Sequence, residues 1–397
     1  MSKIMFLCCL FQNYMCRLFV TILVLFIFLT LDSVVQAQFN FNSSSDDAVV
    51  ESSEFTPSKY GPRRGAKTEH TWVAGIELEP GSQLENVTIT IPVPTGWFEQ
   101  ETKSYRWTKG RGSVPKGVNF HIVNNGAKEA VLKIDNLRLR NKLAIILEFD
   151  TINYEVEPPH DTDIFMIPKR ITNEIAPYLK PSPKIEIEES RVSSVLRKTL
   201  REITNNKQTD WEKVDAIYRY VQSRVKYNDA NKSLPAKGVK ALLAMSEDKC
   251  EGDCKDICGL FVAMCRLHKI PARLVRLPEH CYAEFYLEVN KNLAATKEKE
   301  KEEKNKTVNS NVKPSIKNLS ALPSGFWFPC QVAGTYCFGE IHERQIILQK
   351  GDSFPDPENP PNGKKQFITE VFEGSLIQGS PPPRFRFIHD VKDTKVE

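Results

Sequence analysis

Cys254 and His280 are the residues whose types and settings best suit a chemical step. Cys254 lies in the turn that opens a predicted helix, where unpaired backbone N–H groups and the helix dipole favour a thiolate. Pro271 ends this helix, and His280 stands at the start of the second apolar run after it. A thiol and an imidazole so placed predict a cysteine nucleophile activated by a histidine. The apolar residues that define the helix recur at helical spacing: Ile257, Leu260, Phe261, Met264 and Leu267.

The charged residues and other histidines near this pair are predicted to be structural. Asp253 would oppose a thiolate if it pointed inward, so we expect it to face solvent. Asp256 should complement the helix dipole, and Glu284 should brace its strand. His268 is expected near the end of the helix, and His342 is a weaker alternative base.

Three predicted helices lead the chain to Cys254. The first spans residues 191–203, with its apolar side chains on one face. The second opens with a capping box, Thr209 to Glu212. A short third helix covers 238–245. The apolar faces of these helices are expected to form core, not a ligand groove.

Alternating apolar residues upstream of residue 158 predict an antiparallel β-sandwich. Asn124-Asn125-Gly126 is a hairpin signal between two of the runs. The tryptophans of this region are expected in its core or at its rim. The predicted strands are 71–78, 87–93, 118–123, 130–134 and 143–149.

Four motifs, in order, resemble the transglutaminase-like superfamily, over roughly residues 192–348. They are Gly252-Asp-Cys-Lys-Asp256, Lys269-Ile-Pro-Ala-Arg273, His280-Cys-Tyr-Ala-Glu284 and Trp327-Phe-Pro329. The resemblance implies a papain-like core of helices packed on an antiparallel sheet, and hence an α+β chain with the sandwich in front. It also implies that Cys254 and His280 act together on a protein or peptide substrate.

Gln331 stands where the resembled family usually has an aspartate as third catalytic residue. An amide oxygen can orient a histidine without supplying charge, as asparagine does in papain-like enzymes. Gln331 is therefore the predicted partner of His280. The alternative is that the chain has lost its chemistry and binds peptide or protein.

Ten cysteines occur, and seven remain if the first 37 residues are removed. An odd number in an exported protein leaves at least one thiol unpaired, as a nucleophile requires. Disulfides among the other six are compatible with export, with no connectivity fixed by the sequence. Neither Cys250-Cys254-Cys258 nor Cys330 with Cys337 has the pair spacing of zinc frameworks. We expect no metal and no cofactor.

Residues 1–37 have the pattern of a signal peptide: basic residues, the apolar run 18–31, and a small-residue exit at Ala37. The run is short for a spanning helix, although a retained membrane tether stays open. Either way the chain is expected to be exported. The formal net charge of +4 over 397 residues gives no reason to expect nucleic acid as a partner. The oligomeric state is not predictable.

The predicted function is acyl transfer or hydrolysis at a carboxamide or peptide bond, through a thioester on Cys254. Hydrolase and cross-linking transferase use the same residues, so both remain open. The predicted organisation is a signal peptide (1–37), a spacer (38–66), a sandwich (67–157), a linker (158–190), a catalytic domain (191–350) with a low-complexity insertion (290–320), and an extension of edge strands (351–397).

Overall fold

The computed structural model describes residues 48–49, 59–108, 117–231, 235–306, 324–356, 358–359 and 363–396. The expected signal peptide, most of the expected spacer and the second half of the insertion lie outside these residues. Among the helices of the described part, none has the length and apolarity needed to cross a membrane.

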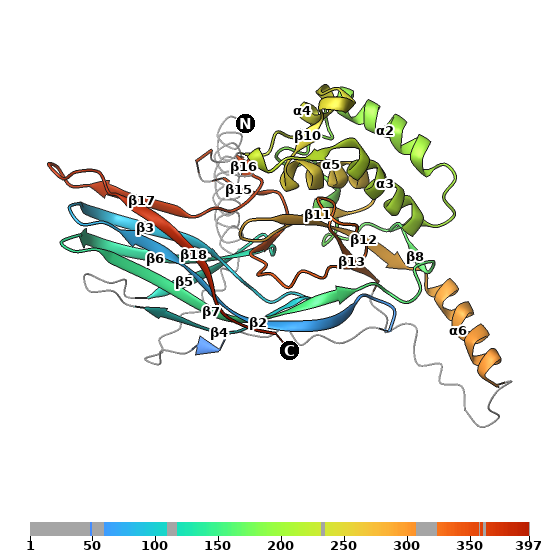
Figure 1. Cartoon of the computed structure of the whole chain (residues 1–397), viewed down its shortest axis with the longest axis horizontal. Coiled ribbons are helices and arrows are strands. Elements are labelled where there is room, and N and C mark those ends of the chain that lie inside the picture. Colours follow the sequence, from blue (N-terminus) through green and yellow to red (C-terminus); the bar gives the residue numbers. More distant parts are fainter. Residues whose placement is uncertain are drawn as a thin grey trace, which may run out of the picture. The chain divides into compact units, whose positions relative to one another are not determined.

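Two large sheets carry most of the strands (Figure 1). The first runs in the order β1 (Ala48–Val49), β4 (Gln100–Thr108), β7 (Leu143–Glu157), β2 (Arg63–Leu78) and β18 (Phe385–Val396). The second runs β13 (Gly325–Cys330), β12 (Cys281–Val289), β11 (Ala272–Arg276), β14 (Gln349–Lys350), β6 (Ala127–Arg138), β3 (Gln83–Val93) and β17 (Val371–Leu376), with β5 (Val118–Val123) on β6 and β8 (Phe165–Met166) on β12. Two small sheets pair β9 (Lys226–Tyr227) with β10 (Glu251–Gly252) and β15 (Phe354–Pro355) with β16 (Lys364–Lys365).

The inner faces of the two large sheets share one apolar core, which accounts for the alternating pattern of the sequence. Ile76 on β2 and Leu147 on β7 are fully buried in it, as are Ile89 on β3 and Leu132 on β6. Strand β4 was not predicted, because its sequence is mostly polar and has no apolar alternation. The short strand β1 lies in the predicted spacer. Strand β5 has the predicted bounds, and β2, β3, β6 and β7 extend the predicted strands.

A second core lies between the helices and the strands β11, β12 and β13, on whose face the helices α2 to α5 gather (Figure 1). The capping box at Thr209 is present, with Glu212 as its reciprocal partner. The α+β class is as predicted, with helices packed on an antiparallel sheet. The helices are α2 (Ser190–Thr204), α3 (Asp210–Arg224), α4 (Val239–Ala244), α5 (Cys254–Leu267) and α6 (Lys291–Lys306), with 3-10 turns at Ala176–Leu179, Asp229–Asn231 and Glu247–Lys249.

The second large sheet runs continuously from β17, β3 and β6 to β11, β12 and β13, the strands under the helices. The junction is the short strand β14, which pairs with β11 on one side and, through Gln349 and Ala127, with β6 on the other. The two C-terminal strands end the two sheets: β17 lies on β3, and β18 lies on β2. The strands β3 and β6 and the strands under the helices thus belong to one hydrogen-bonded sheet.

Part of the low-complexity insertion is helical. Helix α6 covers 291–306, and Ala294 in its first turn is buried against the core. Its lysines and glutamates have high helix propensity, so a segment with few apolar residues still forms a helix. The prediction of a low-complexity insertion did not consider this helix propensity.

Candidate active site

Cys254 is the first residue of α5, and it is 3% exposed. Asp253 is the N-cap, and its side chain accepts hydrogen bonds from the N–H groups of Lys255 and Asp256. The expectation that Asp253 faces solvent is wrong, because the side chain is 1% exposed and forms an ion pair with Lys255. The hydrogen bonds from the helix N–H groups stabilise this buried carboxylate in place of water.

The turn before Cys254 is held by a close contact that only glycine permits. A Cβ on Gly252 would lie 2.7 Å from the Cβ of Asp256, well inside van der Waals contact. The carboxylate of Asp256 accepts a hydrogen bond from the N–H of Lys237, at 2.6 Å, and so ties the turn to the chain leading into α4. Gly252 and Asp256 therefore have structural roles around the thiol.

His280 directly precedes β12, and Gln331 directly follows β13, the antiparallel neighbour of β12. The side chains of Cys254 and His280 influence each other: the imidazole acts to lower the pKa of the thiol, and the thiol acts to raise the pKa of the imidazole. On its other side, Nε2 of His280 lies 3.0 Å from Oε1 of Gln331. The structure therefore brings all three predicted residues together, in the order Cys254, His280, Gln331.

Glu343 is a further member of this series, which sequence reasoning missed. Its Oε1 accepts a hydrogen bond from Nε2 of Gln331 at 3.0 Å. The amide nitrogen of Gln331 also lies 2.7 Å from the ring of His280. Because a carboxylate is an acceptor only, the amide nitrogen faces Glu343, and the amide oxygen is available to accept from Nε2–H of His280. A residue twelve positions after Gln331, in an irregular loop, gives no sequence signal.

Tyr218 on α3 holds the main chain that carries Gln331. Its hydroxyl donates to the carbonyl of Gln331 at 2.8 Å and accepts from the N–H of Cys337 at 3.0 Å. The tyrosine is fully buried, so this bridge is shielded from water. It fixes the end of β13 from the helical side.

The surroundings of Cys254 favour its protonated form. The neighbouring Cys281 thiol, and then burial, raise the pKa of Cys254 well above its ordinary value, and His280 acts the other way. Burial works to lower the pKa of His280, but its interactions with Cys254 and Gln331 and the charge of Glu343 leave that pKa raised. The resting pair is therefore a neutral thiol beside an imidazole that holds its proton more tightly than usual.

Replacing Cys281 with alanine is expected to lower the pKa of Cys254, because it removes the neighbouring thiol that raises this pKa most. Only the thiolate reacts with iodoacetamide, so labelling of Cys254 at neutral pH should accelerate about tenfold for each unit of pKa lost. The measurement is the alkylation rate of the Cys254 peptide against pH, by mass spectrometry. Cys258→Ala, which removes the buried thiol that contacts Cys281 from α5, is the control. If the alkylation profile of Cys281→Ala matched that of the unaltered chain, Cys281 would not be the residue that raises the pKa of Cys254.

The arginine and glutamate of the second and third motifs form a buried ion pair. Arg273 and Glu284 are directly opposite each other on β11 and β12, and Nε of Arg273 lies 2.6 Å from Oε2 of Glu284. The guanidinium also stacks on the ring of Trp327, 4.0 Å from its centroid. Glu284 thus braces its strand as expected. Arg273, Glu284 and Trp327, which come from three of the four motifs, contact one another through the guanidinium.

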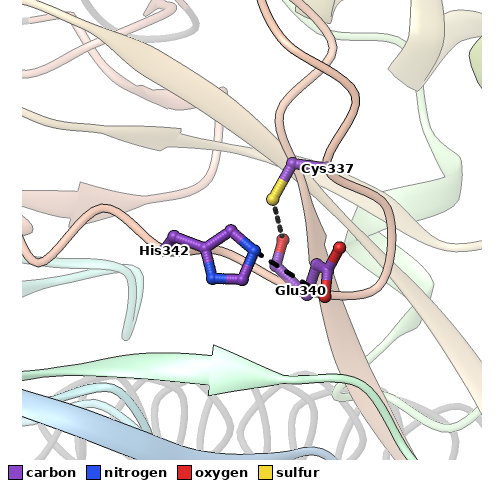
Figure 2. A group of neighbouring side chains, drawn as sticks. All are labelled: Cys337, Glu340 and His342. Carbon is purple, nitrogen blue, oxygen red and sulfur yellow. Dashed lines mark hydrogen bonds and ion pairs between the residues drawn. The ribbon is translucent and has the colours of Figure 1, made fainter.

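The remaining cysteines and histidines lie as follows. All seven cysteines of the described residues are free and buried, so the disulfides that export would allow are not formed. His268 is the C-cap of α5. His342, the alternative base, lies beside Glu340 and Cys337 (Figure 2). The imidazole that interacts with Cys254 is that of His280.

Comparison with known proteins adds one sequence match and three structural likenesses. The family model described as the transglutaminase-like superfamily matches residues 197–308. No curated protein matches the chain in sequence. A candidate cysteine protease from Cytophaga hutchinsonii is 13% identical, with a TM-score of 0.49 over 84% of this chain and 94% of its own. The periplasmic domain of TgpA from Pseudomonas aeruginosa, bound to ethylmercury, is 11% identical, with a TM-score of 0.26 over 56% of this chain and 86% of its own. A candidate protease from Parabacteroides distasonis is 12% identical, with a TM-score of 0.23 over 58% of this chain and 42% of its own.

The matched segment contains α3, α4 and α5, the strands β11 and β12, and two of the three predicted site residues, Cys254 and His280. Three of the four motifs lie within it, and Trp327-Phe-Pro329 lies after it. Residues 197–308 of the chain are therefore similar in sequence to the transglutaminase-like superfamily.

Proposed function

We propose that the chain is an exported cysteine-dependent enzyme that cleaves or transfers the acyl group of a carboxamide or peptide through a thioester on Cys254. The observation that supports this most is the convergence of Cys254, His280 and Gln331, in which His280 is hydrogen-bonded to Gln331 and its imidazole acts to lower the pKa of the Cys254 thiol. The three residues come from a helix start and from two neighbouring strand ends. Export rests on the apolar run near the N-terminus.

In the proposed reaction His280 is the general base. With Nε2–H donated to Gln331, Nδ1 is left to take the proton of the Cys254 thiol as the sulfur attacks the carbonyl carbon. The tetrahedral intermediate collapses to a thioester, and His280 returns the proton to the departing amine. Water or a second amine then attacks the thioester, loses its proton to His280, and releases the acyl group from the sulfur.

The oxyanion of the intermediate needs donors close to Cys254. The backbone N–H of Cys254 is the natural first one, at the positive end of α5. Asp253 binds the N–H groups of Lys255 and Asp256, and so caps the helix without using that of Cys254. The nucleophile and its oxyanion donor would thus come from one residue.

We propose that Gln331 and Glu343 together replace the aspartate of the usual triad. The amide orients the imidazole, and the carboxylate behind it supplies the negative charge at one remove. A charge near His280 stabilises the imidazolium that forms when the thiol proton is transferred. Glu343 is a positioning residue, because it acts on His280 through Gln331.

Glu343→Gln is expected to lower the pKa of His280, because it removes a charge that raises that pKa while an amide oxygen can still accept from Gln331. The chain has only seven histidines, so the imidazole signals can be followed by NMR in the full chain with labelled histidine. Glu343→Ala also removes the acceptor, and should in addition slow turnover on the order of tenfold, within the range of general-base catalysis. Glu247→Gln removes the same charge from an exposed 3-10 turn and is the control. An unshifted His280 signal in Glu343→Gln would remove Glu343 from the proposal.

The reaction class is tested by offering the full chain a glutamine-containing protein together with a labelled primary amine. Incorporated label indicates transfer, and cleaved or deamidated product without label indicates hydrolysis. An adduct on Cys254 after acid quenching identifies the thioester in either case. If neither an adduct nor a product that depends on Cys254 is found, the proposed acyl transfer or hydrolysis through a thioester on Cys254 is excluded.

The second candidate is a binding module for peptide or protein that has lost its chemistry. The raised pKa of the Cys254 thiol and its near-complete burial favour this candidate. It predicts that peptide binding survives Cys254→Ala with unchanged affinity and that no acyl product forms.

A further inference from the structure

Three side chains with different metal-binding atoms converge in the loop after β13. Cys337, Glu340 and His342 offer a sulfur, a carboxylate oxygen and an imidazole nitrogen, all within 4.8 Å of one another (Figure 2). Nε2 of His342 lies 3.8 Å from Oε2 of Glu340, and Sγ of Cys337 lies 3.1 Å from the carbonyl oxygen of Glu340. We call these three residues the loop cluster.

The backbone places Glu340 and His342 on the same side of the chain. Between them, Ile341 forms two hydrogen bonds with Val156 at the end of β7, both of 2.9 Å. In an extended stretch paired in this way, residues two apart point in the same direction. The pairing with β7 therefore fixes the carboxylate and the imidazole as neighbours.

A glycine turn returns the chain so that Cys337 meets this pair. Gly339 has φ of +74°, a conformation that favours glycine, and a Cβ there would lie 2.6 Å from the ring of Trp211. The main chain of Cys337 is held at both ends, because its N–H donates to Tyr218 and its carbonyl accepts from the N–H of Gln331 at 2.9 Å. The three side chains thus stand on a backbone that is fixed before any ligand binds.

The exposure of the loop cluster is graded. Cys337 is 7% exposed, whereas the side chain of Glu340 is 26% exposed and that of His342 is 65% exposed. The thiol is shielded from bulk solvent, and the imidazole is largely exposed to it. An ion can therefore enter from the His342 side.

We propose that Cys337, Glu340 and His342 bind a divalent transition-metal ion, with zinc the best match to their chemistry. Thiolate, imidazole and carboxylate are the ligands that zinc takes in proteins, at about 2.0 to 2.3 Å, and three of them leave a fourth position for water. Tetrahedral ligands at those distances lie about 3.3 to 3.8 Å apart, so small side-chain rotations would close the set. A search for paired cysteines does not find this site, because its spacing is Cys-x-x-Glu-x-His within one loop.

Metal binding here would release a proton from Cys337. The thiol is buried beside Glu340 and would bind the ion as a thiolate. The bound cation would offset the negative charge of Glu340. It would also tether the loop that contains both Gln331 and Glu343. The site can be tested without any assay of catalysis.

The test is titration of the full chain with Co²⁺, followed by displacement with Zn²⁺. A thiolate bound to Co²⁺ gives charge-transfer absorption in the near ultraviolet, which zinc abolishes on replacing cobalt. We expect this band in the unaltered chain, and a zinc-dependent rise in melting temperature, since a ligand that binds only the folded state stabilises it.

Cys337→Ser and His342→Ala are the decisive variants. Cys337→Ser can keep the hydrogen bond to the carbonyl of Glu340 and should fold, but it removes the band. His342→Ala should weaken zinc binding by more than the 10- to 100-fold, roughly, that loss of an outer partner of a ligand costs. His160→Ala, at an exposed histidine elsewhere, is the control and should bind like the unaltered chain. Absence of the band in the unaltered chain, or its persistence in Cys337→Ser, would overturn the proposal.

Discussion

Replacing Cys254 with alanine should abolish turnover, with a loss of at least about 10⁴-fold in rate. The loss is large because the thioester cannot form, so His280 and the oxyanion donor can act only on direct attack by water. The measurements are product formation by the full chain and the mass of the acid-quenched protein, which should carry no acyl group.

Cys258→Ala is the matched control for this variant. Cys258 is fully buried one turn further along α5, and its thiol donates to the carbonyl of Cys281 at 3.5 Å. Its loss should reduce stability slightly and leave the acyl adduct on Cys254 in place. If Cys254→Ala turned over substrate within tenfold of Cys258→Ala, Cys254 would not be the nucleophile.

The placement of the nucleophile and base was predictable because it depends on local sequence. The apolar period predicted the helix α5, which is buried almost all round, Pro271 follows its end, and the short run 272–275 lies in β11. A strand that begins immediately after His280 then carries the imidazole to the edge facing the start of the helix. These are preferences of neighbouring residues, and tertiary packing did not override them.

The contacts that set the chemistry of the site were not predictable. The neighbour that raises the pKa of Cys254 most is Cys281, which lies twenty-seven positions later and next to His280. The acceptor behind Gln331 is Glu343, in a loop without regular structure. The prediction that Asp253 faces solvent was wrong, because its side chain caps the helix that begins at Cys254. Such outcomes depend on which side chains a folded core brings together.

The sheet junction also had no sequence signal. Strand β14 is two residues long, and one of them, Lys350, is a lysine that would ordinarily mark a surface position. Its ammonium is buried between the carboxylates of Glu284 and Glu99, within hydrogen-bonding distance of both. Only the presence of both partners makes this position tolerable, and neither is near it in sequence.

Glu284→Gln is therefore expected to destabilise the chain by about 3 to 5 kcal/mol, the cost of leaving a buried charge without its partner. Lys350 would keep only Glu99, and Arg273 would lose its 2.6 Å ion pair. Urea unfolding of the full chain measures the change without adding salt. Glu288→Gln, on the same strand where the carboxylate accepts only a long hydrogen bond from the N–H of Lys169, should cost about 0.5 kcal/mol or less.

The pH dependence of stability distinguishes the contribution of the Glu284 charge from that of its packing. Burial would raise the pKa of this carboxyl, but Arg273 and Lys350 lower it from 4.5 to about 2. A depressed folded-state pKa means that the stabilisation is fully present above the unfolded value and is lost as the pH falls toward the folded one. The difference in free energy of unfolding between the unaltered chain and Glu284→Gln should be constant at neutral pH and shrink as the pH falls from 4.5 toward 2. A difference that stayed constant to the lowest pH would assign the loss to packing, and the two motif residues would then hold β11 to β12 by fit and not by charge.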